Sequence, residues 1–226
     1  MRQIVHGGHS GGRHASRPRF TCSSEICMMR IMRNAKHGTR TSAKEASHER
    51  IVSAAARAIR RSGYGGTGVA DIMKEAGLTH GAFYAHFESR EAMLAEAASR
   101  ACAESAAVAA NVAASVPPEQ ALAVMLRTYL SPEHVAQVEL GCPLAALGSE
   151  TPRQAPEVRR ATTRHVKEMI DLVARQSPDW GQPGAHERAL ATVATMVGTL
   201  LLARAVDEPA LSASLREAAL KHLGAA

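Results

Sequence analysis

The stretch Gly77-Leu78-Thr79-His80-Gly81-Ala82-Phe83-Tyr84-Ala85-His86-Phe87 holds three of the seven aromatic residues in the chain. Phe83 and Phe87 are four positions apart, so on a helix they share one face and can anchor it. His80 and Tyr84 are also four apart and occupy the other side together with His86. We therefore predict a very short helix, held by two phenylalanines, that presents hydrogen-bonding groups outward. Such a helix has what reading of a DNA major groove requires.

A short amphipathic helix is predicted just before this stretch, over residues 69–76, where apolar residues recur at i, i+3, i+4 and i+7. Gly68 is placed to be its N-cap, and Gly77 to end it in a left-handed conformation, after which Thr79 can cap the next helix. Two helices joined by a short turn that contains glycine form a helix-turn-helix. The alternative is a helical hairpin of a buried core, which would not set two histidines and a tyrosine opposite two phenylalanines.

Composition favours an all-α protein. The 226 residues are 46% hydrophobic but only 3% aromatic, and long alanine-rich runs favour helices over strands. The net charge of +6 is unevenly spread, because residues 1–50 contain ten Lys and Arg against three Asp and Glu while the remainder is nearly balanced. Positive charge before and beside the helix-turn-helix suits contact with DNA phosphates, although a solvated basic tail is the alternative.

The N-terminal 40 residues are rich in Gly, Arg, His and Ser and show no periodicity, so we predict a disordered basic extension there. The run Ser42-Ala43-Lys44-Glu45 has the pattern of a capping box and predicts a helix from there to about Ser62. Three methionines near position 30 leave open whether the natural start is Met1 or a later Met. We accordingly divide the chain into the extension (1–40), a DNA-binding domain (41–90) and a second helical domain (91–226).

Several classes of site and location are disfavoured by the sequence. The four cysteines lack the spacing of a zinc site, so neither a metal nor a cofactor is expected. The start of the chain has no apolar stretch of the kind a secretion signal needs. The longest apolar run, residues 192–206, is shorter than a membrane span and is interrupted by Gly198 and Arg204. We therefore expect a cytoplasmic protein that makes no membrane contact.

Further helices are expected in the second half of the chain. Apolar periodicity predicts them over residues 118–130, 156–176, 185–206 and 211–223, with a short one that starts after Cys142, where Pro143 takes the first helical position. Residues 131–141 and 178–184 are predicted to be loops.

A family resemblance covers about 45 residues closely, from Glu49 to Leu94. The residues that carry it are Arg50-Ile51, Gly63-Tyr64, Val69-Ala70-Asp71-Ile72, Gly77-Leu78-Thr79, Gly81-Ala82-Phe83-Tyr84, His86-Phe87 and Ser89-Arg90-Glu91-Ala92. As a set they resemble the DNA-binding domain of the TetR/AcrR family of transcriptional repressors. The second half resembles the family in length and layout, and residues 141–148 and 202–206 resemble a subgroup of it. Two positions depart from the family pattern: Met73, where many members have alanine, and Arg90, where lysine is commoner.

The resemblance implies how the short helix would meet DNA. Residues expected to contact phosphates are Thr79, Tyr84, His86 and Arg90, and those expected to face base edges are His80, Gly81 and Ala82. Phosphate contacts set the register and carry no sequence information. The resemblance also implies a homodimer on a near-palindromic operator, and we expect the helices at 156–176 and 185–206 to form its interface.

The resemblance further implies that the second half binds a small effector which releases the operator. Apolar residues that can line an effector cavity are Leu126, Tyr129, Leu144, Leu147, Met169 and Val173, and each of them can equally be solid core. Cys142 offers a different trigger, because a thiol at a helix start is stabilised as thiolate and can react with electrophiles or oxidants. A small buried apolar residue is the alternative there.

An enzyme remains a remote alternative. His134 and His165 lie within about 25 positions of Cys142, but their spacing does not match a Cys-His catalytic pair. A Gly-rich phosphate loop is also absent from the sequence. We therefore expect a regulator and not a catalyst.

Overall fold

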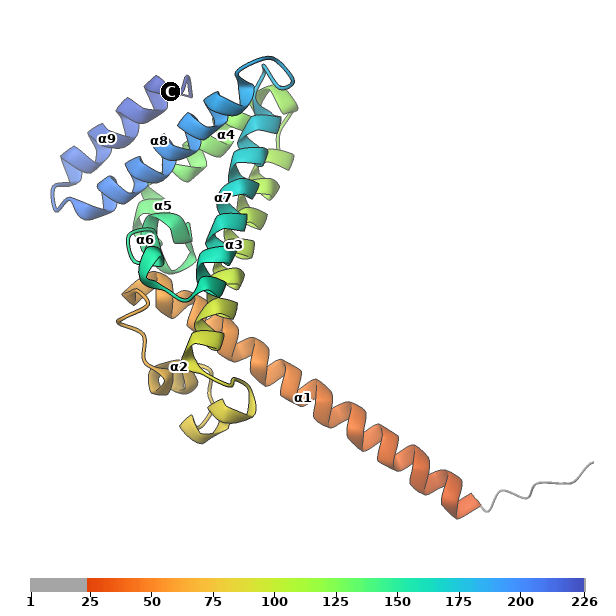
Figure 1. Ribbon diagram of the computed structural model, residues 1–226. Coiled ribbons are helices and arrows are strands. Elements are labelled where there is room, and N and C mark those ends of the chain that lie inside the picture. The colour runs from red at the N-terminus through yellow and green to blue at the C-terminus, as the bar shows by residue number, and fades with distance from the viewer. Residues whose placement is uncertain (1–23, 226) are drawn as a thin grey trace, which may run out of the picture. The chain divides into compact units, whose positions relative to one another are not determined.

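The structure, a computed structural model, describes the backbone of residues 24–225 and the side chains of residues 42–225 (Figure 1). Every regular element in these residues is a helix, which confirms the all-α prediction. The longer helices are α1 (Ser24–Ser62), α3 (Arg90–Ala114), α4 (Pro118–Tyr129), α7 (Pro156–Gln176), α8 (Ala185–Ala205) and α9 (Pro209–His222). The short ones are α2 (Val69–Glu75), α5 (Pro132–Ala136), α6 (Pro143–Leu147) and the 3₁₀ helices η1 (His80–Ala85), η2 (Val138–Leu140) and η3 (Thr151–Arg153). Two compact units divide the chain after Lys44, and both apolar cores lie in the second, Glu45–Ala226.

Helix α1 begins earlier than the sequence predicted. It starts at Ser24 and not at Ser42, so the predicted capping box lies inside a continuous helix. A capping side chain is needed only where the first N–H groups lack partners, and inside a helix these groups bond to carbonyls four residues back. The predicted boundary at residue 40 therefore falls within α1. The disorder predicted for residues 1–23 concerns positions outside the described residues.

Helices α2 and η1 form the predicted helix-turn-helix. Gly68 is the N-cap of α2. Gly77 takes a left-handed φ of 70° after it. The N–H of Leu78 donates to the Met73 carbonyl at 2.9 Å and that of Gly77 to the Lys74 carbonyl at 3.0 Å, a Schellman ending that only a residue tolerant of positive φ permits. The second helix is 3₁₀ and not α, and Thr79 stands at its N-cap without a side-chain bond to it.

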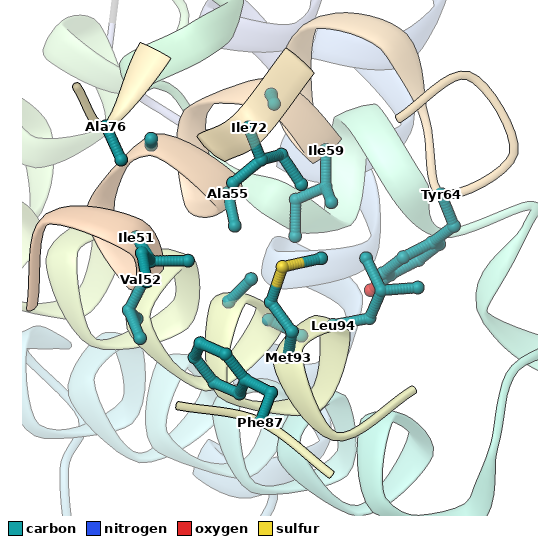
Figure 2. Close-up of a cluster of buried hydrophobic side chains, with 14 of the residues drawn as sticks. Ile51, Val52, Ala55, Ile59, Tyr64, Ile72, Ala76, Phe87, Met93 and Leu94 are labelled. Carbon is teal, nitrogen blue, oxygen red and sulfur yellow. The ribbon is translucent and has the colours of Figure 1, made fainter. Parts of the chain in front are cut away.

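The first core joins α1, α2, η1 and the start of α3, and its apolar side chains converge in Figure 2. Its buried members include Ile51, Ile59, Ile72, Met73, Phe83, Phe87, Met93 and Leu94. Phe83 and Phe87 are only 2% and 4% exposed, and their rings stack with centroids 5.6 Å apart. The prediction that these two rings anchor the short helix is confirmed. Leu147 and Val158, from much later in the chain, also belong to this core.

The second core is built from α4, α7, α8 and α9, with α7 running alongside α3 (Figure 1). Helix α7 has the predicted bounds, and α4, α8 and α9 fall within two residues of theirs. The prediction of a loop over residues 131–141 is wrong, because this stretch holds α5 and η2. Ser131 caps α5 by accepting the His134 N–H at 3.2 Å, and Pro132 takes the first helical position. These local signals were present, but both helices are too short for apolar periodicity to reveal them.

Candidate functional site

The outward face of η1 carries two of the three side chains that the sequence placed there, His80 and Tyr84, whereas His86 is half-buried. His80 is exposed, and Tyr84 is 72% exposed although it is a large aromatic residue. The rings of His80 and Tyr84 lie edge to face with their centroids 6.4 Å apart. The rings of Tyr84 and Phe83 lie edge to face as well, with their centroids 5.3 Å apart. The tyrosine is therefore oriented by the buried ring beneath it while its side chain faces solvent. A fixed, exposed hydroxyl on a helix that two buried rings hold in place suits a contact with an external partner.

The remaining predicted positions of this helix have different environments. Thr79 and Gly81 are exposed, and a Cβ added at Gly81 would meet nothing within 4 Å, so the protein itself does not require glycine there. Ala82 is half-buried and packs against the first core. His86 is also half-buried, and its ring lies 5.8 Å from that of His48 on α1. His48 in turn stacks on Phe87 at 4.6 Å and bonds Glu96 at 2.7 Å.

Arg90, which the family resemblance placed at a DNA phosphate, makes hydrogen bonds within the protein. Its Nη2 donates to the carbonyl of Tyr64 and to that of Thr67, the latter at 3.1 Å. These carbonyls belong to the loop between α1 and α2, so the guanidinium ties this loop to the start of α3. These loop carbonyls lie outside a helix and need hydrogen-bond donors, which the Arg90 guanidinium supplies.

A cavity of about 330 Å³ lies in the second half of the chain. It is lined from α3 by Ser105, Val108, Ala109 and Val112; from α4 by Met125, Thr128 and Tyr129; from the following segment by Ser131, Glu133, His134, Gln137, Leu140, Gly141 and Cys142; and from α7 and α8 by Met169, Leu172, Val173 and Met196. Most of these side chains are apolar. The volume and the lining are those of a site for a small, largely apolar molecule.

Four of the seven residues predicted for effector binding, Cys142 among them, line this cavity, and the other three of these four are Tyr129, Met169 and Val173. The three predicted residues that do not line it are corrections. Leu126 and Leu144 are buried in the second core without bordering this cavity, and Leu126 borders a separate recess near the chain end. Leu147 belongs to the first core. Periodicity shows which face of a helix is buried, but it does not distinguish side chains that meet other side chains from those that meet a void.

His134 fixes the wall of the cavity and was missed as a site residue. Its Nδ1 lies 2.6 Å from the Tyr129 carbonyl, and its Nε2 accepts the backbone N–H of Cys142 at 3.0 Å. Arg204 of α8 donates to the carbonyls of His134 and Val135, at 2.6 and 3.2 Å. Gly141 leaves room for this arrangement, because a Cβ there would come within 2.8 Å of both His134 and Arg204. No local sequence pattern links residues 134, 142 and 204, so only the fold reveals the cluster.

Burial favours the uncharged forms of the histidine and the tyrosine at this wall. Burial lowers the pKa of His134, and the nearby Arg204 adds to this against the opposing bond to the Tyr129 carbonyl. Burial, with Cys142 nearby, raises the pKa of Tyr129 well above its ordinary value. Cys142 is only 1% exposed, and its backbone N–H donates to His134 Nε2. Burial also raises the pKa of the neighbouring Cys102 to about 12. Three or more potential metal ligands gather nowhere in the described residues.

Comparisons with known proteins agree with this geometry. Residues 51–97, which span the first core and the helix-turn-helix, match the model of the bacterial regulatory proteins of the tetR family. An uncharacterised HTH-type transcriptional regulator of Mycobacterium tuberculosis is 30% identical over 165 residues, which cover 69% of this chain and 83% of that protein. The HTH-type transcriptional regulator LmrA of Bacillus subtilis is 28% identical over 69% of this chain and 85% of its own. Among solved structures, a TetR transcriptional regulator from Chloroflexus aurantiacus superposes with a TM-score of 0.67 at 26% identity, covering 80% of this chain and 94% of its own.

Proposed function

Because this chain belongs to the TetR family of bacterial regulatory proteins, and is thus a DNA-binding transcriptional regulator, we propose that it is a cytoplasmic repressor released by a small apolar effector. The observation that carries the proposal is the apolar cavity of about 330 Å³ in the same compact unit as an exposed recognition helix. A ligand releases DNA only if it favours a protein conformation that fits the operator less well. Six helices border this cavity, namely α3, α4, α5, η2, α7 and α8, so a ligand has contacts through which it can favour one arrangement of them.

On the DNA side, η1 would enter the major groove. Thr79, Tyr84 and His86 would contact phosphates, and His80, Gly81 and Ala82 would face base edges. Arg90 would act mainly through the loop that it holds, since two of its donors already bond to loop carbonyls. The exposure of Tyr84 and His80 supports this orientation.

A second copy of the chain would cover the exposed apolar face of α8 and α9. Leu190, Leu201 and Leu202 of α8 and Leu211 of α9 are all more than a third exposed, and the most apolar window of α8, whose mean hydropathy of 1.3 would suit a membrane span, is only 28% buried. Helix α7, which was expected to form the interface together with α8, is less suited to contact a second copy. Its exposed face carries the charged residues Arg159, Arg160, Lys167 and Glu168. Apolar helix faces of this kind pair well across a two-fold axis. We thus assign the dimer contact to α8 and α9.

The DNA part is tested with a duplex selected from a random pool by the parent protein. Tyr84→Phe removes a hydrogen bond from an uncharged hydroxyl to phosphate, so the Kd should rise about fivefold on every sequence, and because no cation is lost the salt dependence should change little. Tyr64→Phe, at a buried tyrosine in the first core, is the matched control and should leave the Kd unchanged. Anisotropy titrations that give Tyr84→Phe the parent affinity would remove η1 from the interface, and a parent with no preference among duplexes would refute the repressor.

The dimer part is tested by sedimentation. Leu202→Asp places a charge on the α8 face and should convert the dimer into monomers at micromolar concentration. Trp180→Asp changes an equally exposed apolar residue outside that face and should leave the dimer intact. A monomeric parent, or a dimeric Leu202→Asp variant, would show that this face is not the interface.

Thiol-based sensing is a second candidate, favoured by the position of Cys142 in the cavity wall. An electrophile held there would meet the sulfur, and with N-ethylmaleimide a C–S bond would form across the double bond while the thiol proton passes to the neighbouring carbon. Operator binding by the parent and by Cys142→Ser is compared with and without this reagent. If the reagent changes operator binding equally in both proteins, Cys142 is not the sensor and the apolar effector remains the trigger.

A further inference from the structure

The cavity wall and the helix-turn-helix are joined by a chain of charged contacts. We call residues 137–142 the wall segment; Gln137, Leu140, Gly141 and Cys142 of this segment line the cavity. Between them, Glu139 points the other way and accepts a hydrogen bond from Arg61 Nη1 at 3.0 Å. A short segment thus has one set of side chains on the cavity and another on α1.

Arg61 is bonded on both sides. Its Nη2 lies 3.2 Å from Glu75 Oε2, so one guanidinium bridges Glu139 of the wall segment and Glu75 of α2. The other oxygen of Glu75 pairs with Arg57 at 2.9 Å. Glu75 is the last residue of α2, immediately before the turn that leads to η1. The bridge therefore ends on the helix that sets the angle of the recognition helix.

Arg60 attaches the wall segment to α1 a second time and also binds α3. Its side chain is fully buried, and its three nitrogens donate to the Ala56 carbonyl at 3.0 Å, to Glu104 of α3 at 2.6 Å and to the Gly141 carbonyl at 3.4 Å. A buried guanidinium with fixed partners resists independent movement of those partners, since each unpaired group would be left without solvent. The wall segment is accordingly attached to the end of α1 at a second point, so a shift of the segment acts on this helix end.

The charge states agree with a bridge that is occupied at neutral pH. The hydrogen bonds to Glu139 and Glu75 raise the pKa of Arg61. Partial burial alone would raise the pKa of Glu75, but the bonds from Arg57 and Arg61 outweigh it and lower the value. The pKa shifts of Arg61 and Glu75 thus both favour the charged forms of these side chains.

We propose that occupation of the cavity is transmitted to the helix-turn-helix through the wall segment, by the Arg61 bridge between Glu139 and Glu75. This inference rests on the proposed effector cavity and adds the route of its action. A molecule that enters the cavity shifts the wall segment, Glu139 then pulls on or releases Arg61, and the end of α2 changes its angle. Coupling of this kind is a property of pairs of residues and is measured by removing one partner.

The test compares parent protein with Glu139→Gln, which keeps the shape of the side chain and removes its charge. Glu168→Gln, on the exposed face of α7, removes an equal charge away from the bridge and is the matched control. The probe is N-phenyl-1-naphthylamine, a neutral apolar dye whose fluorescence reports its own binding. For each protein the operator Kd is measured with and without saturating dye, and the dye Kd is measured alone.

In the parent and in Glu168→Gln the dye should raise the operator Kd about tenfold or more, whereas in Glu139→Gln the increase should fall below about threefold. The dye Kd and the dye-free operator Kd should stay within about twofold of the parent throughout. An undiminished dye effect in Glu139→Gln would overturn the bridge as the route while leaving the effector cavity intact.

A second arm needs no ligand and separates failure of the bridge from failure of the cavity assignment. Ala109→Phe puts a ring into the cavity and should weaken operator binding in the parent background but much less beside Glu139→Gln. Thermal melts check that the variant folds, and Ala109→Met replaces it if it does not. If the dye does not bind, the apolar effector fails, and the bridge is then judged by this arm alone. Equal weakening in both backgrounds, or none in either, would overturn it.

Discussion

The two cores of this protein differ in their aromatic content, although both contain buried methionines, which are Met73 and Met93 in the first. The first core surrounds two stacked phenylalanine rings, and the second borders a cavity of about 330 Å³ against which three methionines lie, Met125, Met169 and Met196. Phenylalanine has few rotamers and fixes what packs on it, whereas methionine is unbranched and adapts to what lies beside it. The helix η1 is thus anchored by two rings with few rotamers, whereas the side chains around the cavity can adapt to what occupies it.

The largest effect should follow from breaking the first core. Phe83→Ala removes a buried ring and should lower the free energy of unfolding by about 3–5 kcal/mol. Tyr84→Ala, at the exposed neighbouring ring, should cost less than about 1 kcal/mol. Urea titrations of both variants measure this. A Phe83→Ala variant with the stability of the parent would show that the rings do not form the rigid half of the comparison.

The protein is expected to lose stability at acidic pH because of one buried histidine on α7, His165. Burial lowers the pKa of His165 on α7 from 6.5 to about 4, and neither ring nitrogen has a hydrogen-bond partner in the described residues. The unfolded chain therefore binds a proton between these values that the folded chain does not. Stability should be complete above pH 6.5 and should fall by up to about 3 kcal/mol as the pH drops toward 4. His165→Leu should lack this contribution, and parallel slopes of the two proteins in this range would exclude it.

The packing of the two cores can be compared by replacing one buried methionine in each with alanine and measuring the loss of stability. Met73→Ala in the first core should cost about 2–4 kcal/mol, because the side chain is fully buried among packed neighbours. Met169→Ala should cost about 1–2 kcal/mol, because this side chain borders an existing cavity and has fewer contacts to lose. Calorimetric melts of the pair provide the measurement. Equal costs would mean that the two cores are equally well packed.

The smallest effect concerns the loop that Arg90 holds. Arg90→Ala frees the carbonyls of Tyr64 and Thr67 and should lower stability by about 1 kcal/mol. Arg90→Lys keeps the charge but lacks the forked donors of the guanidinium, so its stability should lie between those of the parent and Arg90→Ala. If Arg90→Ala keeps the melting temperature of the parent while its operator affinity loses one unit of salt slope, the side chain contacts phosphate and not the loop.

The sequence predicted the first core better than the second for a physical reason. Gly77 and the Phe83–Phe87 pair act through their immediate neighbours, so spacing alone placed the turn and the buried face. The position of the cavity depends on where helices far apart in the chain leave a gap, and Leu126 and Leu144 show the same periodicity as the residues that line it. Arg61, Glu75 and Glu139 carry no pattern that relates them, and they meet only because the fold brings them together.

The two bonds of His134 have a consequence for where its protons sit. A carbonyl can only accept and a backbone N–H can only donate, so the bond to Tyr129 requires a hydrogen on Nδ1 and the bond from Cys142 requires a lone pair on Nε2. The ring is therefore held as one neutral tautomer. A proton added to Nε2 would face the Cys142 N–H and release the end of the cavity wall, so nitrogen chemical shifts of this single imidazole report whether the wall is closed.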